Sequence, residues 1–178
     1  MPKIKSIAQV IVGAMVSFSL VPLGEQVALA RRPYFLLETL CADSGPGNWS
    51  GNSLNVSIGR AAYRSLLSMS PGNRYASLTC RIKPINSQPV FQRLTLAFGM
   101  RDNDRRSPAT RVNIYLDGRQ AVSRTVSAAE RAAYSIDVSN VSNVAIETTC
   151  TTQAEYCDRV YFYDATLEPI TPPPRQKK

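Results

Sequence analysis

The sequence contains no histidine among its 178 residues. Histidine is the usual general base of nucleophilic enzymes and a common ligand of zinc and iron, so its absence excludes the standard form of those sites. The chain also lacks the Gly-x-Ser-x-Gly turn that presents a nucleophilic serine. Its 13 acidic residues are scattered rather than paired as glycoside hydrolysis would need. We therefore expect a protein that is not an enzyme and that binds no cofactor.

Long hydrophobic runs are also scarce. The only strongly apolar stretch is Ile7–Val21, which is shorter than the roughly 20 residues that span a membrane. Two lysines precede this stretch, and the small-residue segment Ala28–Ala30 follows it, which is typical of a secretory signal peptide with its cleavage site. We expect residues 1–30 to be removed and the product to be secreted or periplasmic, with no membrane span after cleavage. The alternative is an uncleaved membrane anchor.

The remainder of the chain has the composition of one folded domain, because 44% of all residues are hydrophobic and only 19% are charged. We assign this domain to residues 31–168. Residues 169–178 include three consecutive prolines and end in two lysines, so we expect a disordered tail. The net charge of +8 favours an anionic partner. For an exported protein this indicates an acidic polysaccharide or an anionic envelope surface rather than nucleic acid, unless the charge only keeps the protein soluble.

The four cysteines, Cys41, Cys80, Cys150 and Cys157, all follow the expected signal peptide. An even number without a Cys-x-x-Cys pair favours two disulfides over a metal site in an exported chain. Three pairings are possible. We favour Cys150 with Cys157, which would staple a short hairpin, and this leaves Cys41 with Cys80.

The apolar residues recur with a period of two, which predicts half-buried β-strands. The clearest runs are Leu94–Phe98, Val112–Leu116, Tyr134–Val138 and Val144–Ile146, and weaker ones are Tyr34–Leu40, Leu54–Ile58, Tyr75–Ile82 and Val160–Leu167. Asp117-Gly118 is a strong signal for a two-residue hairpin turn. Only Ser127–Ala133 is a candidate helix. We predict an all-β protein, an antiparallel β-sandwich of roughly eight to ten short strands.

Several short motifs follow one another in a recognisable order. They are Tyr34–Leu40, Asn55–Leu66, Phe98–Asp102, Val112–Gly118, Tyr134–Val141 and Val160–Leu167. In this order they resemble the NPCBM family of carbohydrate-binding modules, which often lie beside glycosidase domains. The resemblance covers nearly the whole mature chain, and it implies a galactose-binding-like jelly roll that binds a glycan.

One motif departs from this family. Its members commonly have Gly-Leu-Gly-x-His just after the tyrosine that corresponds to Tyr63, and here Ser65–Met69 stand at those positions. Met69 replaces the histidine, so we do not expect the family's ligand site at this place.

Sugar recognition needs an exposed aromatic ring that stacks on a pyranose, with polar groups beside it. Trp49, the only tryptophan, lies in a Gly- and Asn-rich segment that predicts an exposed loop; the alternative is a tryptophan that caps one end of the sandwich. Tyr63 and Tyr156 are the other aromatic candidates. Tyr156 lies between the cysteines of the expected hairpin, with Asp158 and Arg159 nearby, and the alternative there is an ordinary polar turn.

The densest charged segment is residues 101–106, which includes Arg101, Asp102 and Asp104. Closely spaced acidic oxygens in a turn are able to ligate Ca²⁺, but the three arginines and the lack of an EF-hand pattern oppose this, so we expect no metal. Bidentate binding of a carboxylate or sulfate by the arginines is a second interpretation, and a solvated hairpin loop is the third.

These observations predict an exported, non-enzymatic module that binds a glycan or polysaccharide, acidic or neutral, of the cell envelope or the extracellular space. We expect Trp49 and the charged loops to form its site. The alternative function is a periplasmic or secreted envelope protein that binds a protein partner or an anionic surface through its basic face and tail.

Overall fold

The alternating apolar residues form thirteen strands and one short 3-10 helix in a computed structural model, which describes residues 32–88, 90–152 and 155–170. In chain order the elements are β1 (Tyr34–Phe35), η1 (Leu36–Glu38), β2 (Leu40–Ser44), β3 (Asn48–Ser50), β4 (Leu54–Ile58), β5 (Ala61–Ser65), β6 (Leu67–Ser70), β7 (Tyr75–Arg81), β8 (Phe91–Gly99), β9 (Thr110–Leu116), β10 (Arg119–Val126), β11 (Arg131–Asp137), β12 (Asn143–Cys150) and β13 (Val160–Pro169). The strands outnumber the expected eight to ten because pieces such as β1 and β3, of two and three residues, are too short to show a period.

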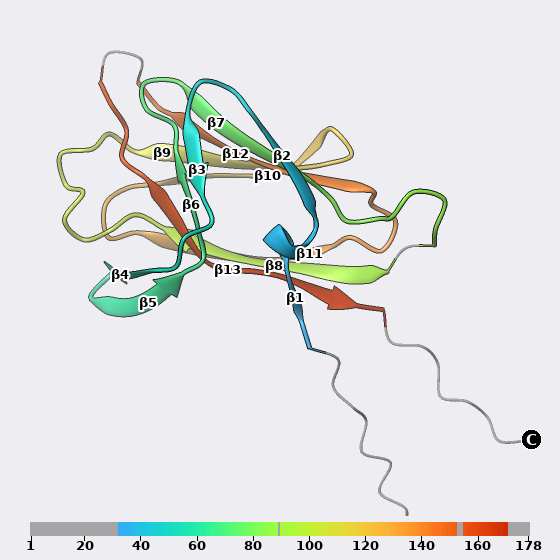
Figure 1. Cartoon of the computed structure of the whole chain (residues 1–178). Coiled ribbons are helices and arrows are strands. Elements are labelled where there is room, and N and C mark those ends of the chain that lie inside the picture. The colour runs from blue at the N-terminus through green and yellow to red at the C-terminus, as the bar shows by residue number, and fades with distance from the viewer. Residues whose placement is uncertain (1–31, 89, 153–154, 171–178) are drawn as a thin grey trace, which may run out of the picture. The chain divides into compact units, whose positions relative to one another are not determined.

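The strands form two facing layers (Figure 1). One sheet has the order β11-β8-β13-β6-β3, with β1 also paired to β13, and the other has the order β10-β9-β12-β7-β2. Every strand pairing is antiparallel in the described residues. The predicted all-β antiparallel sandwich is therefore confirmed.

The main core lies between the two sheets, because every second side chain of the long strands points inward. Leu94, Leu96 and Phe98 of β8 are fully buried, and they belong to one cluster with Val144 and Ile146 of β12 in the other sheet. Burying a side chain of this size stabilises the fold by about 1.5–3 kcal/mol.

A β4–β5 hairpin forms a separate two-stranded sheet that packs on the first sheet away from the main core (Figure 1). Val56 and Ile58 of this hairpin form a second, small core with Tyr161 of β13. The hairpin turns at Gly59 and Arg60, whose φ angles are 61° and 64°. The first sheet is therefore partly covered on its outer face as well as on its inner face.

The candidate helix at Ser127–Ala133 does not form. Residues 131–133 belong to β11, which pairs with β8 and alternates in burial along its whole length. The four residues before it form a turn, in which the Ser127 N–H donates to the Glu130 carboxylate and the Glu130 N–H donates to the Ser127 carbonyl. Ala129 has a φ of 66° there, which no helix tolerates. Strand pairing with β8 outweighs local helix propensity in residues 131–133.

The predicted hairpin turn and the expected disulfides are present. Asp117 and Gly118 both have positive φ and join β9 to β10, as a type I′ turn requires. One disulfide joins Cys41 of β2 to Cys80 of β7, and the other joins Cys150, at the end of β12, to Cys157. The described residues contain no free cysteine.

The expected signal peptide, residues 1–30, lies outside the described residues. At the other end, Pro169 is the last residue of β13, and the Ile170 N–H donates to the Val90 carbonyl, so these two residues of the expected tail belong to the sandwich. The rest of the tail, residues 171–178, lies outside the described residues. Within the described ranges, no helix has the length and the apolar character needed to cross a membrane.

Candidate functional site

Strands β3 and β6 place a row of small polar side chains on the outer face of the first sheet. Leu67 and Met69 of β6 point into the main core, so the alternating Ser68 and Ser70 face outward. Both serines are only 7% exposed. In β3, Ser50 pairs with Ser68 and Asn48 pairs with Ser70, and paired residues share a face of the sheet. The result is a polar strip of three hydroxyl groups and one amide at the edge of the sheet.

Tyr156 lies beside this strip and is 65% exposed. The Tyr156 hydroxyl lies 3.3 Å from the Ser70 Oγ, within hydrogen-bond distance. Its ring lies next to Gly72, where an added Cβ would come within 3.4 Å of the ring. The next residue, Cys157, donates its N–H to the Gly72 carbonyl and is disulfide-bonded to Cys150. Covalent and hydrogen bonds thus hold this exposed ring in place.

Arg159 completes a small pocket with a volume of about 80 Å³ at this position. The described residues that line it are Asn48, Trp49, Ser50, Ser68, Ser70, Tyr156 and Arg159, which we call the Tyr156 site. They offer an aromatic ring, hydroxyl groups, an amide and a guanidinium, and none of the seven is acidic. This set is able to stack on a ring and to hydrogen-bond polar substituents, but it contains no pairing of a nucleophile with a base.

Trp49 belongs to the site but is not the exposed loop residue that the sequence predicted. It lies in β3, pairs with the inward-pointing Met69, is half-buried and packs against the main core. The alternative interpretation, a tryptophan that closes the sandwich, describes it better. The Gly- and Asn-rich flanks predict turns on either side, but a three-residue strand between them leaves no periodic signal in the sequence.

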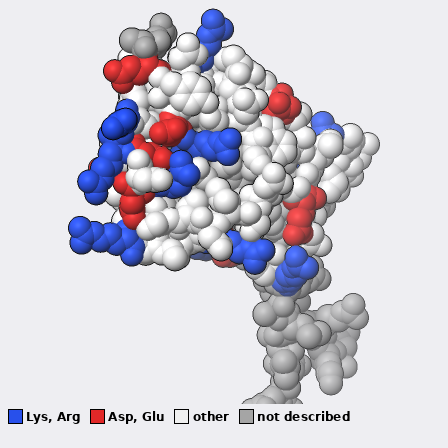
Figure 2. Space-filling view, turned by 60° about the vertical axis from the view of Figure 1, so that its left-hand side comes forward, with Lys and Arg blue, Asp and Glu red and all other residues white. Residues whose placement is uncertain are grey.

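The charged residues predicted at the site hold one another instead of facing the Tyr156 site. The Arg101 guanidinium donates to both oxygens of Asp104, at distances down to 2.8 Å, and the Asp104 residue is only 4% exposed. This hydrogen bond raises the pKa of Arg101 above its ordinary value. Arg101 also lies over the ring of Tyr161, 5.2 Å from its centroid. Figure 2 shows basic and acidic side chains gathered together on one side of the molecule, beside a largely uncharged surface.

Asp102 fastens the β4–β5 turn to the charged loop. Its carboxylate accepts hydrogen bonds from the Ser57 hydroxyl at 2.6 Å and from the Gly59 and Arg60 backbone N–H groups. The Ser57 bond, together with the two backbone bonds, lowers the pKa of Asp102. Both acidic residues of the loop are therefore engaged by protein donors, and the described residues contain no group of three or more potential metal ligands.

Asp158 and Tyr63, the other two candidates, do not line the Tyr156 site. Asp158 is half-buried and donates its backbone N–H to the Ser107 hydroxyl at 2.8 Å, and burial raises the pKa of its carboxyl. Tyr63 of β5 stacks on Tyr163 with ring centroids 4.2 Å apart and accepts a hydrogen bond from Arg131. Burial raises the pKa of Tyr163. Tyr63 therefore contributes to the packing of the β4–β5 hairpin.

Sequence reasoning missed the serines and the asparagine of the site. The Leu-Ser-Met-Ser pattern of β6 indicates that Ser68 and Ser70 share one face. No sequence signal places that face beside Tyr156, which is 86 residues from Ser70 in the chain. Only the strand order brings these segments together.

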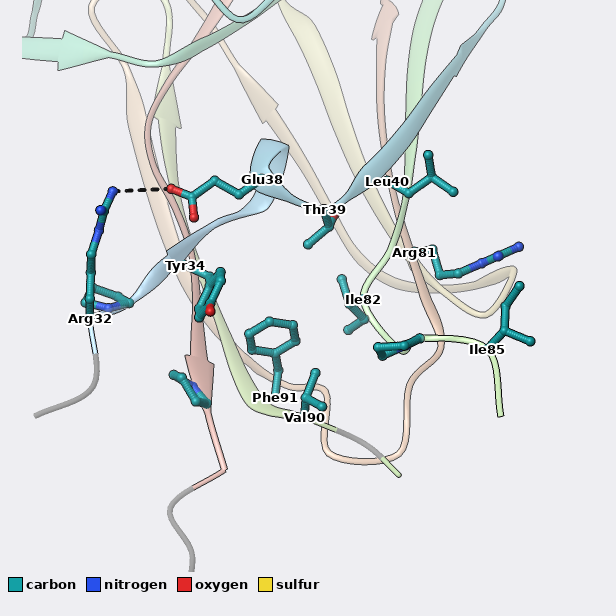
Figure 3. A pocket seen from close by; sticks show the side chains of 13 residues that line it. Arg32, Tyr34, Glu38, Thr39, Leu40, Arg81, Ile82, Ile85, Val90 and Phe91 are labelled. Carbon is teal, nitrogen blue, oxygen red and sulfur yellow. Dashed lines mark hydrogen bonds and ion pairs between the residues drawn. The ribbon is translucent and has the colours of Figure 1, made fainter. Parts of the chain in front are cut away.

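A larger groove of about 980 Å³ lies elsewhere on the molecule. It is bordered by β1, η1, the start of β2, the end of β7, the start of β8 and the end of β13. Figure 3 shows Tyr34, Ile82, Val90 and Phe91 gathered around it, with an ion pair between Arg32 and Glu38 at one side. The two sites lie at opposite ends of β13. Arg159 of the Tyr156 site directly precedes this strand, and Pro169, its last residue, borders the groove. None of the residues predicted for the site lines this groove.

No protein-family profile and no curated protein matches this sequence. Solved structures do match the fold. A structure with a catalytic domain and two CBM51 domains of ZmpB from Clostridium perfringens has a TM-score of 0.63 at 12% identity, and the match covers 79% of this chain and 15% of that one. A second structure from the same protein, which holds CBM51-2 in complex with GlcNAc and INT domains, has a TM-score of 0.61 at 11% identity, over 76% of this chain and 31% of that one.

A third match is a single module: the CBM51 of a Clostridium perfringens GH95 protein in complex with methyl-galactose. It has a TM-score of 0.59 at 11% identity, over 76% of this chain and 99% of the module. The chain thus spans almost the whole of one isolated carbohydrate-binding module but less than a third of the two longer chains. At these identities the likeness shows the fold alone, a jelly-roll β-sandwich.

Proposed function

We propose that this chain is an exported, non-enzymatic carbohydrate-binding module that recognises a glycan of the cell envelope or the extracellular space through the Tyr156 site. The observation that carries the proposal is the exposed ring of Tyr156, held in place beside hydroxyl, amide and guanidinium groups. A sugar presents an apolar face to an aromatic ring and hydroxyl groups to polar neighbours, so it matches both parts of the site.

The matched folds support this function. The CBM51 structures were solved with GlcNAc and with methyl-galactose, so hexoses of these kinds are the first ligands to test on this chain. Export is supported by the signal-like segment at residues 1–30 and by the two disulfides, which form in oxidising compartments.

The Tyr156 site is a better sugar site than the larger groove. The groove is lined mainly by aliphatic, proline and aromatic side chains, and its Tyr34 ring packs edge-on against Phe91 with centroids 5.6 Å apart. Arg32 and Glu38 at its border are paired with each other at 3.5 Å. The other polar side chains of the groove are Thr39 and Arg81, so hydrogen-bonding groups form a smaller share of its lining than at the Tyr156 site.

The test is a glycan array and affinity electrophoresis on the purified protein, with Tyr156→Ala compared with Ile85→Ser. Ile85 lines the groove and is 72% exposed, so its replacement alters the groove without touching the core. We expect wild type and Ile85→Ser to bind the same glycans, and Tyr156→Ala to bind about tenfold more weakly, the equivalent of about 1.4 kcal/mol.

Two controls keep the result interpretable. Circular dichroism and thermal unfolding show whether each variant is folded, and Tyr156→Phe keeps the ring while it removes the hydroxyl bonded to Ser70. Absence of glycan binding by the wild type contradicts the proposal, and so does binding that survives in Tyr156→Ala and is lost in Ile85→Ser.

A further inference from the structure

Arg159 is an exposed cation at the Tyr156 site that forms no ion pair with any of the described residues. The ion pairs among the described residues join Arg32 to Glu38, Arg93 to Glu168 and Arg101 to Asp104. Arg159 takes part in none of them. One interpretation of the sequence was that arginines of the 101–106 loop bind an anion, but there Arg101 is held by Asp104.

The polar groups beside Arg159 are also available. Within the described part of the chain, neither the Ser68 hydroxyl nor the Asn48 amide makes a hydrogen bond, although both line the pocket. The amide and the hydroxyl are able to donate, as is the guanidinium. Three potential donors, from β3, β6 and the residue just before β13, therefore line one small space.

The acidic groups near Arg159 are few. Asp158 precedes it in the chain and interacts with it electrostatically, but its side chain does not line the pocket, and its backbone N–H is fixed by Ser107. Asp104 also interacts with Asp158, but its carboxylate is engaged by Arg101. The space in front of Arg159 thus has a cation at its wall and no carboxylate among its described lining residues.

The pocket is too small for a whole sugar ring. Its volume of about 80 Å³ is that of two or three water molecules, since each water occupies about 30 Å³ of liquid. A single substituent fits this space while the ring to which it is attached rests against the exposed face of Tyr156.

We propose that the pocket receives the anionic substituent of an acidic sugar, a carboxylate or a sulfate, with Arg159 as its counter-ion and Ser68 and Asn48 as hydrogen-bond donors. The proposal rests on the proposed function, because the sugar ring would lie on Tyr156. An arginine binds a carboxylate or sulfate with two parallel N–H···O bonds, which gives both strength and orientation. The acidic sugar is thereby distinguished from a neutral one of the same shape.

The test uses an array of matched glycan pairs, each printed in an anionic and a neutral form. The pairs are sialylated glycans with their desialylated forms, uronate oligosaccharides with their methyl esters, and sulfated galactans with their desulfated forms. Wild type is compared with Arg159→Gln and Arg159→Lys. The control is Arg119→Gln, which removes the same charge from the exposed surface of β10 in the other sheet.

We expect the wild type to prefer the anionic member of at least one class of pair. Arg159→Gln should weaken binding of that member roughly ten- to a hundredfold and leave the neutral member unchanged. Arg159→Lys should keep part of the preference, because a lysine supplies the charge without the bidentate fork. Arg119→Gln should bind like the wild type, and the preferred class identifies the substituent as carboxylate or sulfate.

Three results overturn the proposal. Equal binding of both members of every pair, lost in Tyr156→Ala, refutes the acidic ligand and leaves the proposed function standing. If Arg159→Gln and Arg119→Gln weaken binding of the anionic glycan equally, the net positive charge of the protein, rather than this pocket, attracts the glycan. Absence of any glycan binding refutes both proposals together.

Discussion

At the residue scale, Trp49 and Tyr156 border the same small pocket but differ in what surrounds their rings. Trp49 pairs with the core residue Met69 and packs on the main core, whereas Tyr156 is 65% exposed. The polar strip of Ser68 and Ser70 lies on the other face of β6 from Met69. The two aromatic residues therefore have separable roles, one in stability and one in binding.

Replacement of Trp49 by alanine is expected to lower the free energy of unfolding by about 2–4 kcal/mol, because it removes a large, half-buried side chain from the edge of the core. Urea unfolding followed by circular dichroism measures this loss. Tyr156→Ala, measured in the same way, should stay within about 1 kcal/mol of the wild type. If Trp49→Ala is as stable as the wild type, the ring is not a core residue.

Asp102 gives stability a pH dependence at acidic pH. Its pKa is lowered in the folded protein by the bonds from Ser57, Arg60 and Gly59, so its contribution is present above the ordinary carboxyl pKa and is lost as the pH falls through the folded value. We expect Asp102→Asn to be less stable than the wild type at pH 7 and the difference to shrink below about pH 4. Urea unfolding from pH 7 to pH 2.5 measures both. A difference that stays constant over this range would contradict the role of the ionised carboxylate.

At the scale of elements, the sequence allowed the long strands to be predicted because their burial alternates. β12 and β11 follow a period of two along their full length, and the Asp117-Gly118 turn fixes the hairpin between β9 and β10. The segment before β11 was mistaken for a helix because its alanines and Glu130 favour one. The pairing of β11 with β8 depends on residues more than 30 positions away in the chain, which a local pattern does not contain.

The two disulfides act on different elements, so their loss should have different effects. Cys41–Cys80 closes a loop of 39 residues and Cys150–Cys157 a loop of 7, for which the chain-entropy relation gives about 4 and about 2.5 kcal/mol. We expect Cys41→Ser/Cys80→Ser to be the less stable double variant in urea unfolding. Glycan binding should be weakened mainly in Cys150→Ser/Cys157→Ser, because this bridge holds the segment that carries Tyr156. These expectations would be contradicted if Cys150→Ser/Cys157→Ser were the less stable variant and Cys41→Ser/Cys80→Ser were the weaker glycan binder.

The expected site residues do not all lie together, for a related reason. Tyr156, Arg159 and Trp49 were expected at the site and do border one pocket. Arg101, Asp102 and Asp104 were expected with them, but each forms its hydrogen bonds within the protein. Residue type indicates what a side chain is able to bind, whereas its actual partner is set by which strands become neighbours.

At the scale of the whole described domain, β13 connects two different surfaces. Near its start lies the Tyr156 site with its hydroxyl groups and Arg159, and at its end lies the apolar groove bordered by Pro169. The central claim is that the first of these surfaces binds the glycan. The larger volume of the groove does not make it the better sugar site, because hydrogen-bonding groups beside an aromatic ring, rather than volume, match the chemistry of a sugar.

The most direct measurement of that claim is an NMR titration of the ¹⁵N-labelled protein with the glycan that binds most tightly on the array. The account predicts that the amide signals of Ser68, Ser70, Tyr156 and Arg159 shift with a single dissociation constant, while those of Leu40, Ile82, Ile85 and Val90 around the groove stay in place. Shifts confined to the groove residues, or no shift at millimolar glycan, would contradict it.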